Sequence, residues 1–352
     1  MRGLQHVDRP FRRPFQLVAT LIILCALSAC GFLGPASIST ERGSYIDVLA
    51  QTDREELLGN LVRLKYSEPP VFLQVGSITA SPSLELGVEG EVNLGNNVPP
   101  PSVVAKPNIV YKDAPTIVYA PLSGTEFATE ILTPMGLPSV YLMLENGFAF
   151  DVIADLMLVS INGLSNARDA PAAERAMFRQ AATAFTRLIA AGLVQSGTVE
   201  SGGELEIAID LAGAAGTADG DLVARAWGLD LSAGQIRVER GLGGGASVLS
   251  VRTRSLLAIM SYLSNSVEAP AAHASQVWPS PGDPDPPMRV RVNTARPAGA
   301  AVAVRQRGHW FYVAADDLKS LNALYLLRVL FNLQAQASGG QIPQVQLTLP
   351  VQ

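Results

Sequence analysis

The segment Thr52–Ile78, TDREELLGNLVRLKYSEPPVFLQVGSI, decides the fold class, because two hydrophobic periods meet in it across a pair of prolines. In its first half, apolar residues recur at the spacing of one helical face: Leu57, Leu58, Leu61, Val62 and Leu64. Thr52 and Glu55 form a capping-box pattern that predicts where this helix begins. The helix must end before Pro69, since proline disfavours helical geometry in the preceding residue. The run Val71–Ile78 predicts a strand, so we expect an α+β fold.

The rest of the chain continues with mixed helices and short antiparallel sheets. Helices are expected over 123–134, 138–146, 149–161, 171–191, 219–228, 254–267 and 317–335. Strands are expected over 116–119, 197–200, 204–211, 235–240, 247–252, 288–293 and 343–349, with a hairpin over 301–313 that turns at Gln306 to Gly308. Ser123 and Asp169 are the expected caps of two helices. Residues 84–94 predict a half-buried strand, or a hairpin broken at Gly90.

Two proline-rich stretches suggest how the chain is divided. Residues 98–107 predict a linker or an extended crossing, and the segment 269–287 contains PSPGDPDPP, which cannot form a regular element. We therefore expect an α+β domain over 51–268, a proline-rich linker over 269–287, and a small C-terminal unit over 288–352. That unit would consist of a β-hairpin, a helix and strands.

The N-terminal segment has the pattern of an export signal, expected over residues 1–29. Four arginines and one aspartate precede an apolar run from Leu17 to Ala29, which is shorter than the about 20 residues that a membrane-spanning helix needs. Its end, Leu27-Ser28-Ala29-Cys30, resembles the lipobox of bacterial lipoproteins. The resemblance implies cleavage before Cys30, a diacylglyceryl group on its thiol and an acyl chain on the new amino group. A flexible tether is expected over 30–50.

Other roles for Cys30 are a metal ligand, a disulfide partner, a catalytic thiol, or an incidental residue after an ordinary secretory signal. Cys25 would leave with the signal, and the mature chain offers only His273 and His309 beside Cys30 as imidazole or thiol ligands. Two or more acyl chains hold a protein stably on a bilayer. By the lipoprotein resemblance, Gly31 in place of aspartate implies the outer membrane, facing the periplasm, rather than the inner membrane.

Three further runs resemble an uncharacterised family of proteobacterial lipoproteins: REELLGNLVRLKYSEPPVFLQVGSITA, PTIVYAPLSGTEFATEILTP and VRTRSLLAIMSYLSNSVEAP. The resemblance spans most of the mature chain. It implies the same lipid attachment and contributes no catalytic residue.

Charge limits the possible partners. Residues 1–29 carry +3, so the −5 of the whole chain leaves −8 for the mature part, which excludes a nucleic-acid binder by bulk charge. Charged residues make up 16% of the chain against about 25% in typical domains, which favours a surface covered by a protein partner or by self-association. Residues 288–352 carry +5, which leaves −13 for residues 30–287.

No catalytic motif occurs in the sequence: it has no G-x-S-x-G elbow, S-x-x-K pair, H-E-x-x-H helix or Gly-Lys-Ser/Thr phosphate loop. Gly163–Ala167 lacks the second glycine of an elbow, and Gly241–Ser247 is expected to be a hairpin loop. We expect no metal and no cofactor. Asp151 and Asp155, one helical turn apart, are candidates for the carboxylate pair of a hydrolase, with solvated surface residues as the alternative.

The basic C-terminal segment is the best candidate for a binding surface. Alternation along a strand places Arg289 and Arg291 on one face, and Arg305 and Arg307 share a parity in the hairpin. If these strands pair, the arginines form one patch beside Trp310. Guanidinium groups form paired hydrogen bonds with phosphate and carboxylate, so the patch suits an anionic envelope polymer or an acidic partner. A solvated sheet face is the alternative interpretation.

Three functions remain open at this point. The first is a non-enzymatic binding or scaffold component of a cell-envelope assembly, tethered to the outer membrane. The second is a peptidoglycan or lipid hydrolase with an unrecognised active site. The third, a solute-binding lipoprotein, needs two comparable halves, which the sequence does not show.

Overall fold

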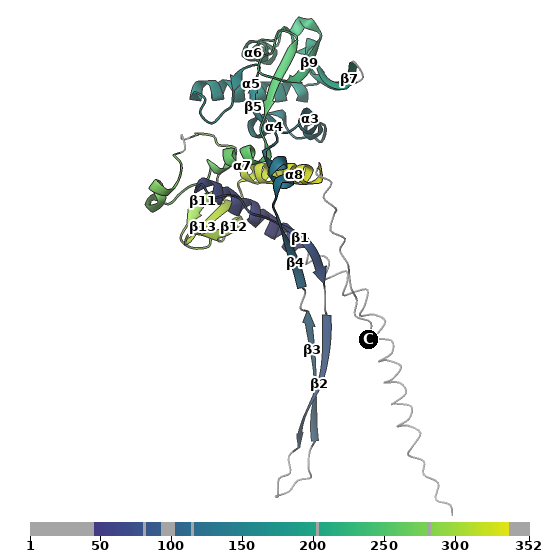
Figure 1. Ribbon diagram of the computed structural model, residues 1–352, viewed down its shortest axis with the longest axis vertical. Coiled ribbons are helices and arrows are strands. Elements are labelled where there is room, and N and C mark those ends of the chain that lie inside the picture. The colour runs from purple at the N-terminus through teal and green to yellow at the C-terminus, as the bar shows by residue number, and fades with distance from the viewer. Residues whose placement is uncertain are drawn as a thin grey trace, which may run out of the picture. The chain divides into compact units, whose positions relative to one another are not determined.

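A computed structural model describes residues 46–79, 82–92, 103–113, 116–201, 204–279 and 283–337. It confirms a mixed α+β fold, with helices among a six-stranded sheet, a three-stranded sheet and two two-stranded ribbons (Figure 1). Contacts divide the chain into two units, Met1–Glu56 and Leu57–Gln352. The expected signal, Cys30 and most of the tether lie outside the described residues.

The first helix is described over residues 46–65, so its predicted start at Thr52 is wrong. The Oγ1 atom of Thr52 donates a hydrogen bond to the carbonyl oxygen of Val48 at 2.8 Å. A threonine inside a helix bonds back to the preceding turn in this way, so it cannot cap. The predicted end is confirmed, because helical geometry stops at Lys65 and Ser67 adopts φ 61° before the proline pair.

Two paired ribbons follow this helix. Strand β1 (Phe72–Thr79) pairs antiparallel with β4 (Thr116–Leu122), and β2 (Pro82–Val92) pairs antiparallel with β3 (Val103–Asp113). Gly90 does not break β2, since it lies opposite Ala105 in an uninterrupted register. The predicted linker over 98–107 is wrong for residues 103–107, which belong to β3. Residues 98–102 lie outside the described part of the chain.

The six-stranded sheet has the order β6-β5-β10-β9-β8-β7. Its strands are β5 (Leu158–Ile161), β6 (Leu164–Ser165), β7 (Gln195–Ser201), β8 (Glu204–Asp210), β9 (Gln235–Arg240) and β10 (Val248–Thr253). The helix expected over 149–161 ends earlier: α4 covers Phe150–Met157, and the chain then extends into β5. Three rings from different helices pack together in the core, with centroids 4.6 Å apart for Phe150 and Phe185 and 5.2 Å for Phe185 and Trp227.

The prediction that Gly241–Ser247 is a hairpin loop is wrong, because β9 and β10 pair in parallel. Asn162 anchors the returning chain: its Oδ1 accepts from the amide of Ser250 at 2.6 Å, and its Nδ2 donates to the carbonyl of Val248 at 3.1 Å. A Cβ on Gly244 would lie 1.9 Å from the Oδ1 of Asn162, so a glycine is required there. Gly244 therefore allows the loop to pack closely against Asn162.

The remaining helices are α2 (Thr125–Leu132), α3 (Leu137–Glu145), α5 (Ala172–Ala190), α6 (Ala218–Trp227), α7 (Leu256–Ser264) and α8 (Leu318–Ala337). Two predicted caps are wrong. The cap of α2 is Gly124 at φ 101°, not Ser123, and the cap of α5 is Pro171, without a side-chain hydrogen bond from Asp169. A positive φ suits glycine, and proline is already fixed near helical φ, so neither start needs a side-chain cap.

The C-terminal sheet has the order β11-β13-β12, formed by β11 (Arg291–Asn293), β12 (Ala300–Gln306) and β13 (His309–Ala314). Its hairpin turns at Arg307 (φ 48°) and Gly308 (φ 79°), where the sequence predicts the turn. The strand expected over 343–349 lies outside the described residues.

The structure does not separate the segments on either side of 269–287, since Leu57–Gln352 form one compact unit. Buried residues from both sides, including Leu263, Phe311 and Leu327, belong to one core cluster. A short 3-10 helix over Ala271–Gln276 lies within the proline-rich segment. In the described part of the chain, no helix is long and apolar enough to cross a membrane.

Candidate functional site

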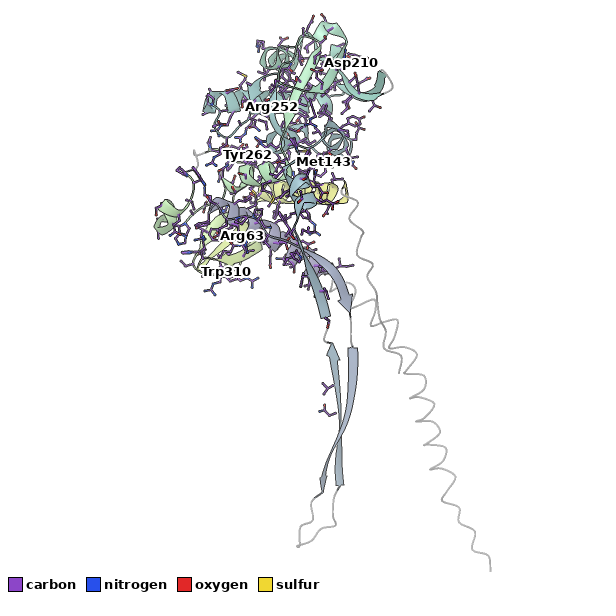
Figure 2. All side chains as sticks on the ribbon, viewed as in Figure 1. Arg63, Met143, Asp210, Arg252, Tyr262 and Trp310 are labelled. Carbon is purple, nitrogen blue, oxygen red and sulfur yellow. The ribbon has the colours of Figure 1, made fainter. Side chains whose placement is uncertain are left out.

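The outer face of the C-terminal sheet carries basic and aromatic residues in two cross-strand rows. Tyr312 on β13 lies opposite Arg291 on β11, and Trp310 lies opposite Arg305 on β12. Residues of the alternate parity, such as Phe311 and Val313, are buried in the core. The predicted alternation therefore places Arg291, Arg305 and Trp310 on one face; Trp310 is labelled in Figure 2.

A third arginine joins this face from the loop between β11 and β12. The guanidinium carbon of Arg296 lies 5.3 Å from the centroid of the Trp310 ring, within the range of a cation–π contact. Sequence reasoning missed Arg296 because strand alternation says nothing about a loop residue. We call Arg291, Arg296, Arg305, Trp310 and Tyr312 the basic aromatic face.

The arginines of the basic aromatic face form no ion pair with any described residue, whereas four arginines elsewhere do: Arg179, Arg187, Arg237 and Arg307. The strands β11, β12 and β13 contain no aspartate or glutamate. Arg296 and Arg305 are exposed, and Arg291 is half-buried. These guanidinium groups are therefore available to an anionic group from outside the chain.

Two members of the predicted patch lie elsewhere. Arg307 forms an ion pair with Glu68 and stacks over the ring of Tyr66, with its guanidinium carbon 4.2 Å from the ring centroid. It therefore holds the β12–β13 turn against the end of the first helix. Arg289 lines a separate cleft of about 320 Å³ together with Arg168 and Arg175.

Two histidines, His273 and His309, come together beside the same turn. The rings of His273 and His309 lie 5.2 Å apart, and the hydroxyl of Tyr66 lies 2.8 Å from the Nδ1 atom of His273. No sequence pattern predicts this pairing, because the two histidines are 36 positions apart in the chain. Among the described residues, no group of three or more potential ligands could hold a metal ion.

The candidate carboxylate pair lines one cavity of about 140 Å³, which also contains Arg179 and Lys319. Asp155 is held by several donors: its Oδ1 accepts from the hydroxyl of Tyr262 at 2.9 Å and from the Nε atom of Arg179 at 3.1 Å. The Oδ1 atom of Asp151 accepts from the amide of Val152 at 3.0 Å. The Oδ1 atom of Asp155 therefore already accepts hydrogen bonds from two side chains of its own chain.

Arg179 connects this network to the proline-rich segment. Its two terminal nitrogens donate to the two carboxylate oxygens of Asp283 at 2.9 and 2.7 Å, a bidentate geometry that is strong and directional. Burial would raise the pKa of Asp283, but the hydrogen bonds from Arg179 outweigh it and lower the pKa below its ordinary value. Burial, followed by the neighbouring charge of Asp155, raises the pKa of Tyr262 to about 12.

Arg254 lies deeper in the same network and is only 5% exposed. Its guanidinium donates to the backbone carbonyls of Asp155, Leu156 and Asn166 at 2.8, 3.0 and 2.6 Å, and lies 4.1 Å from the ring centroid of Tyr262. Burial lowers the pKa of Arg254. We call Asp155, Arg179, Arg254, Tyr262 and Asp283 the buried polar cluster; its groups satisfy one another.

Gly163–Ala167, which resembled a nucleophile elbow, is the turn from β5 into β6 and the residues after it. The Oγ atom of Ser165 accepts from the amide of Ala167 at 3.0 Å, and the amide of Ser165 donates to Glu174. No described histidine hydrogen-bonds to this serine, so the segment provides local turn structure.

No protein-family model, curated protein or solved structure matches the chain.

Proposed function

We propose that the chain is a lipoprotein anchored to the outer membrane through Cys30, facing the periplasm, and that it acts as a non-enzymatic binding component of a cell-envelope assembly. The basic aromatic face would bind phosphate or carboxylate groups of an envelope polymer or an acidic protein. The observation that carries the proposal is the difference between this face, whose arginines have no acidic partner among the described residues, and the satisfied buried polar cluster.

The chemistry of the face supports anion binding. Arg291 and Arg305 lie in neighbouring cross-strand rows, so two guanidinium groups can approach one anionic ligand. Guanidinium binds phosphate and carboxylate through paired hydrogen bonds, and the adjacent aromatic rings add flat apolar contact area. Residues 288–352 carry a formal charge of +5 in an otherwise acidic chain, which favours an encounter with anions at this end.

Capture of partners from crosslinked cells tests the proposal. The full-length lipoprotein and the Arg252→Gln control should recover the same partner, since Arg252 is an exposed strand arginine of another sheet. Arg291→Gln combined with Arg305→Gln should recover much less. Failure of the unaltered protein to recover any stable partner would contradict the proposal, and mass spectrometry showing an unmodified thiol at Cys30 would contradict the anchor.

A cell-envelope hydrolase is the second candidate, because Asp151 and Asp155 line one cavity. The donors around Asp155 disfavour this function. Asp151→Asn combined with Asp155→Asn should leave the hydrolysis of isolated peptidoglycan and lipid unchanged. A loss of hydrolytic activity in this variant, with the fold intact, would favour the hydrolase instead.

A further inference from the structure

The strands β2 and β3 form a ribbon of eleven residues per strand that is paired along its whole length (Figure 1). In the described part of the chain, neither strand pairs with a third one, and neither makes extensive contact with any other element. Both outer edges of the ribbon therefore present backbone donors and acceptors. A two-stranded hairpin is at best marginally stable in water without further packing, so this arrangement calls for an additional partner.

The register sorts the residues of this ribbon into two chemically different faces. One face combines the pairs Leu84–Tyr111, Leu86–Ile109, Val88–Pro107, Gly90–Ala105 and Val92–Val103, without a charge until the terminal pair Pro82–Asp113. The other combines Ser83–Lys112, Glu85–Val110, Gly87–Asn108, Glu89–Lys106 and Glu91–Val104. The ribbon is therefore amphipathic over ten consecutive cross-strand pairs.

Two prolines show which backbone groups face the outer edges. Opposite residues in an antiparallel pair alternate between those that exchange hydrogen bonds and those that exchange none. Pro107 and Pro82 have no amide hydrogen. The register places them six pairs apart, so both belong to the same set of alternate pairs. The pairs that contain these prolines therefore belong to the set that exchanges no hydrogen bonds across the ribbon. The pairs of the apolar face belong to the same set. Its residues on β2 direct five amide groups to the outer edge: Leu84, Leu86, Val88, Gly90 and Val92.

The charges of the polar face differ between the two strands. On this face β2 carries Glu85, Glu89 and Glu91, whereas β3 carries Lys106 and Lys112. Pairing of β2 with β2 of another copy would bring glutamates opposite glutamates, which is destabilising. Pairing of β2 with β3 of the next copy brings acidic and basic residues together, and the two edges have equal length.

We propose that this ribbon is a self-association element, in which the β2 edge of one copy pairs antiparallel with the β3 edge of the next. Because the two edges differ, the contact is head-to-tail, and a repeated rotation closes it into a ring of copies. The ribbons then form one continuous antiparallel sheet with an apolar face and a polar face. Pro107 leaves one amide hydrogen bond unmade at each junction, which is compatible with its place at an edge.

Replacing outward amides tests the pairing directly. In Leu86→Pro with Gly90→Pro, two edge donors are lost, while the bonds within the ribbon are spared. The matched control, Leu86→Ala with Gly90→Ala, keeps both amides. We expect the full-length protein in mild detergent to be oligomeric by native mass spectrometry, and the alanine control to remain so. The proline variant should dissociate at a concentration at least tenfold higher.

Charge reversal tests the head-to-tail arrangement. Variant A carries Glu85→Lys and Glu91→Lys, and variant B carries Lys112→Glu; Glu89 and Lys106 stay unaltered, because they lie opposite each other within one ribbon. Each should assemble poorly alone, because like charges meet at every junction, whereas a mixture should form oligomers with alternating A and B. Assembly of A alone or B alone as well as the unaltered chain, or no assembly of the mixture, would overturn this arrangement.

Two outcomes would overturn the proposal as a whole: a monomeric unaltered protein over the whole concentration range, or proline variants that assemble like the unaltered chain. The proposal is independent of the anion-binding function. Arg291→Gln with Arg305→Gln should leave the oligomer mass unchanged, and the proline variant should still capture the partner of the basic aromatic face after crosslinking. Unfolding by urea, followed by the fluorescence of the buried Trp227, checks that each variant keeps its core.

Discussion

The buried polar cluster and the basic aromatic face use the same residue type in opposite ways. In the cluster, Arg179 and Arg254 donate to carboxylates, a tyrosine hydroxyl and backbone carbonyls, and little of either is exposed. On the face, Arg291 and Arg305 form no ion pair with any described residue. An arginine satisfied by its own chain stabilises the fold, and one left without an acid is available to a partner. Stability and binding measurements should separate the two groups.

Replacement of Arg254 should have the largest effect on stability. Arg254→Met keeps much of the volume but removes the hydrogen bonds to three backbone carbonyls, of which only that of Asp155 has a second donor among the described residues, Asn166, so we expect a loss of about 3–5 kcal/mol in the free energy of unfolding. Urea unfolding monitored by tryptophan fluorescence measures it. The control is Arg252→Met, an exposed arginine two positions earlier, which should change stability by less than about 0.5 kcal/mol. Equal losses in the two variants would contradict this assignment.

The ion pair between Asp283 and Arg179 should contribute less and should depend on pH. Asp283→Asn should lower stability by about 1–2 kcal/mol at neutral pH, because both partners are part-exposed. The pKa of Asp283 is lowered in the folded chain, so its stabilisation is complete above the unfolded pKa of about 3.9 and is lost as pH falls through the folded value.

Thermal unfolding of the unaltered chain and Asp283→Asn between pH 7 and pH 2 tests the sign of this dependence. The difference in Tm should be constant above about pH 5 and should shrink as the pH falls below about 4. A difference that grows with acidity would show that the carboxylate is not stabilised by Arg179.

The contribution of Arg307 to stability should be intermediate between those of the buried polar cluster and of the basic aromatic face, because its ion pair and its stacking on Tyr66 are partly exposed. Arg307→Ala should cost about 0.5–1 kcal/mol, and Arg307→Lys should recover part of that loss. Denaturant unfolding in low and high salt separates the two contributions, since salt screens the ion pair more than the stacking contact. No loss in either buffer would place Arg307 with the exposed arginines.

Local patterns predicted much of the fold and part of the candidate site. Period-two alternation placed Arg291, Arg305 and Trp310 on one face, and the turn at Gly308 followed from its sequence. The missed features depend on distant contacts. The donors to Asp155 come from residues 24 and 107 positions away, and the start of β10, which pairs in parallel with β9, is hydrogen-bonded to Asn162, 88 positions before Ser250.

Helix caps were the weakest local predictions, because a pattern of two residues can occur inside a helix as well as at its start. Thr52 shows this, since its hydroxyl bonds to the turn before it. Arg296 was missed for a related reason: its position follows from the path of a loop, and no periodicity describes that path. Sequence patterns thus identified the strands of the site better than its connecting segment.

Substitution of the arginines on the basic aromatic face should have the smallest effect on stability and the largest on binding. Arg291→Gln with Arg305→Gln should change the free energy of unfolding by less than about 0.5 kcal/mol, because neither residue has an acidic partner among the described residues. Far-UV circular dichroism and urea unfolding check this.

Binding of the full-length protein in neutral nanodiscs to purified lipopolysaccharide and to soluble peptidoglycan fragments, at low and physiological salt, tests the anion-binding function most directly. We expect the unaltered protein and Arg252→Gln to bind at least one of these anions, more weakly as salt rises, and Arg291→Gln with Arg305→Gln to lose at least tenfold in affinity. Equal affinity of all three proteins, or no binding of either anion together with no acidic partner after crosslinking, would contradict a binding role for the basic aromatic face.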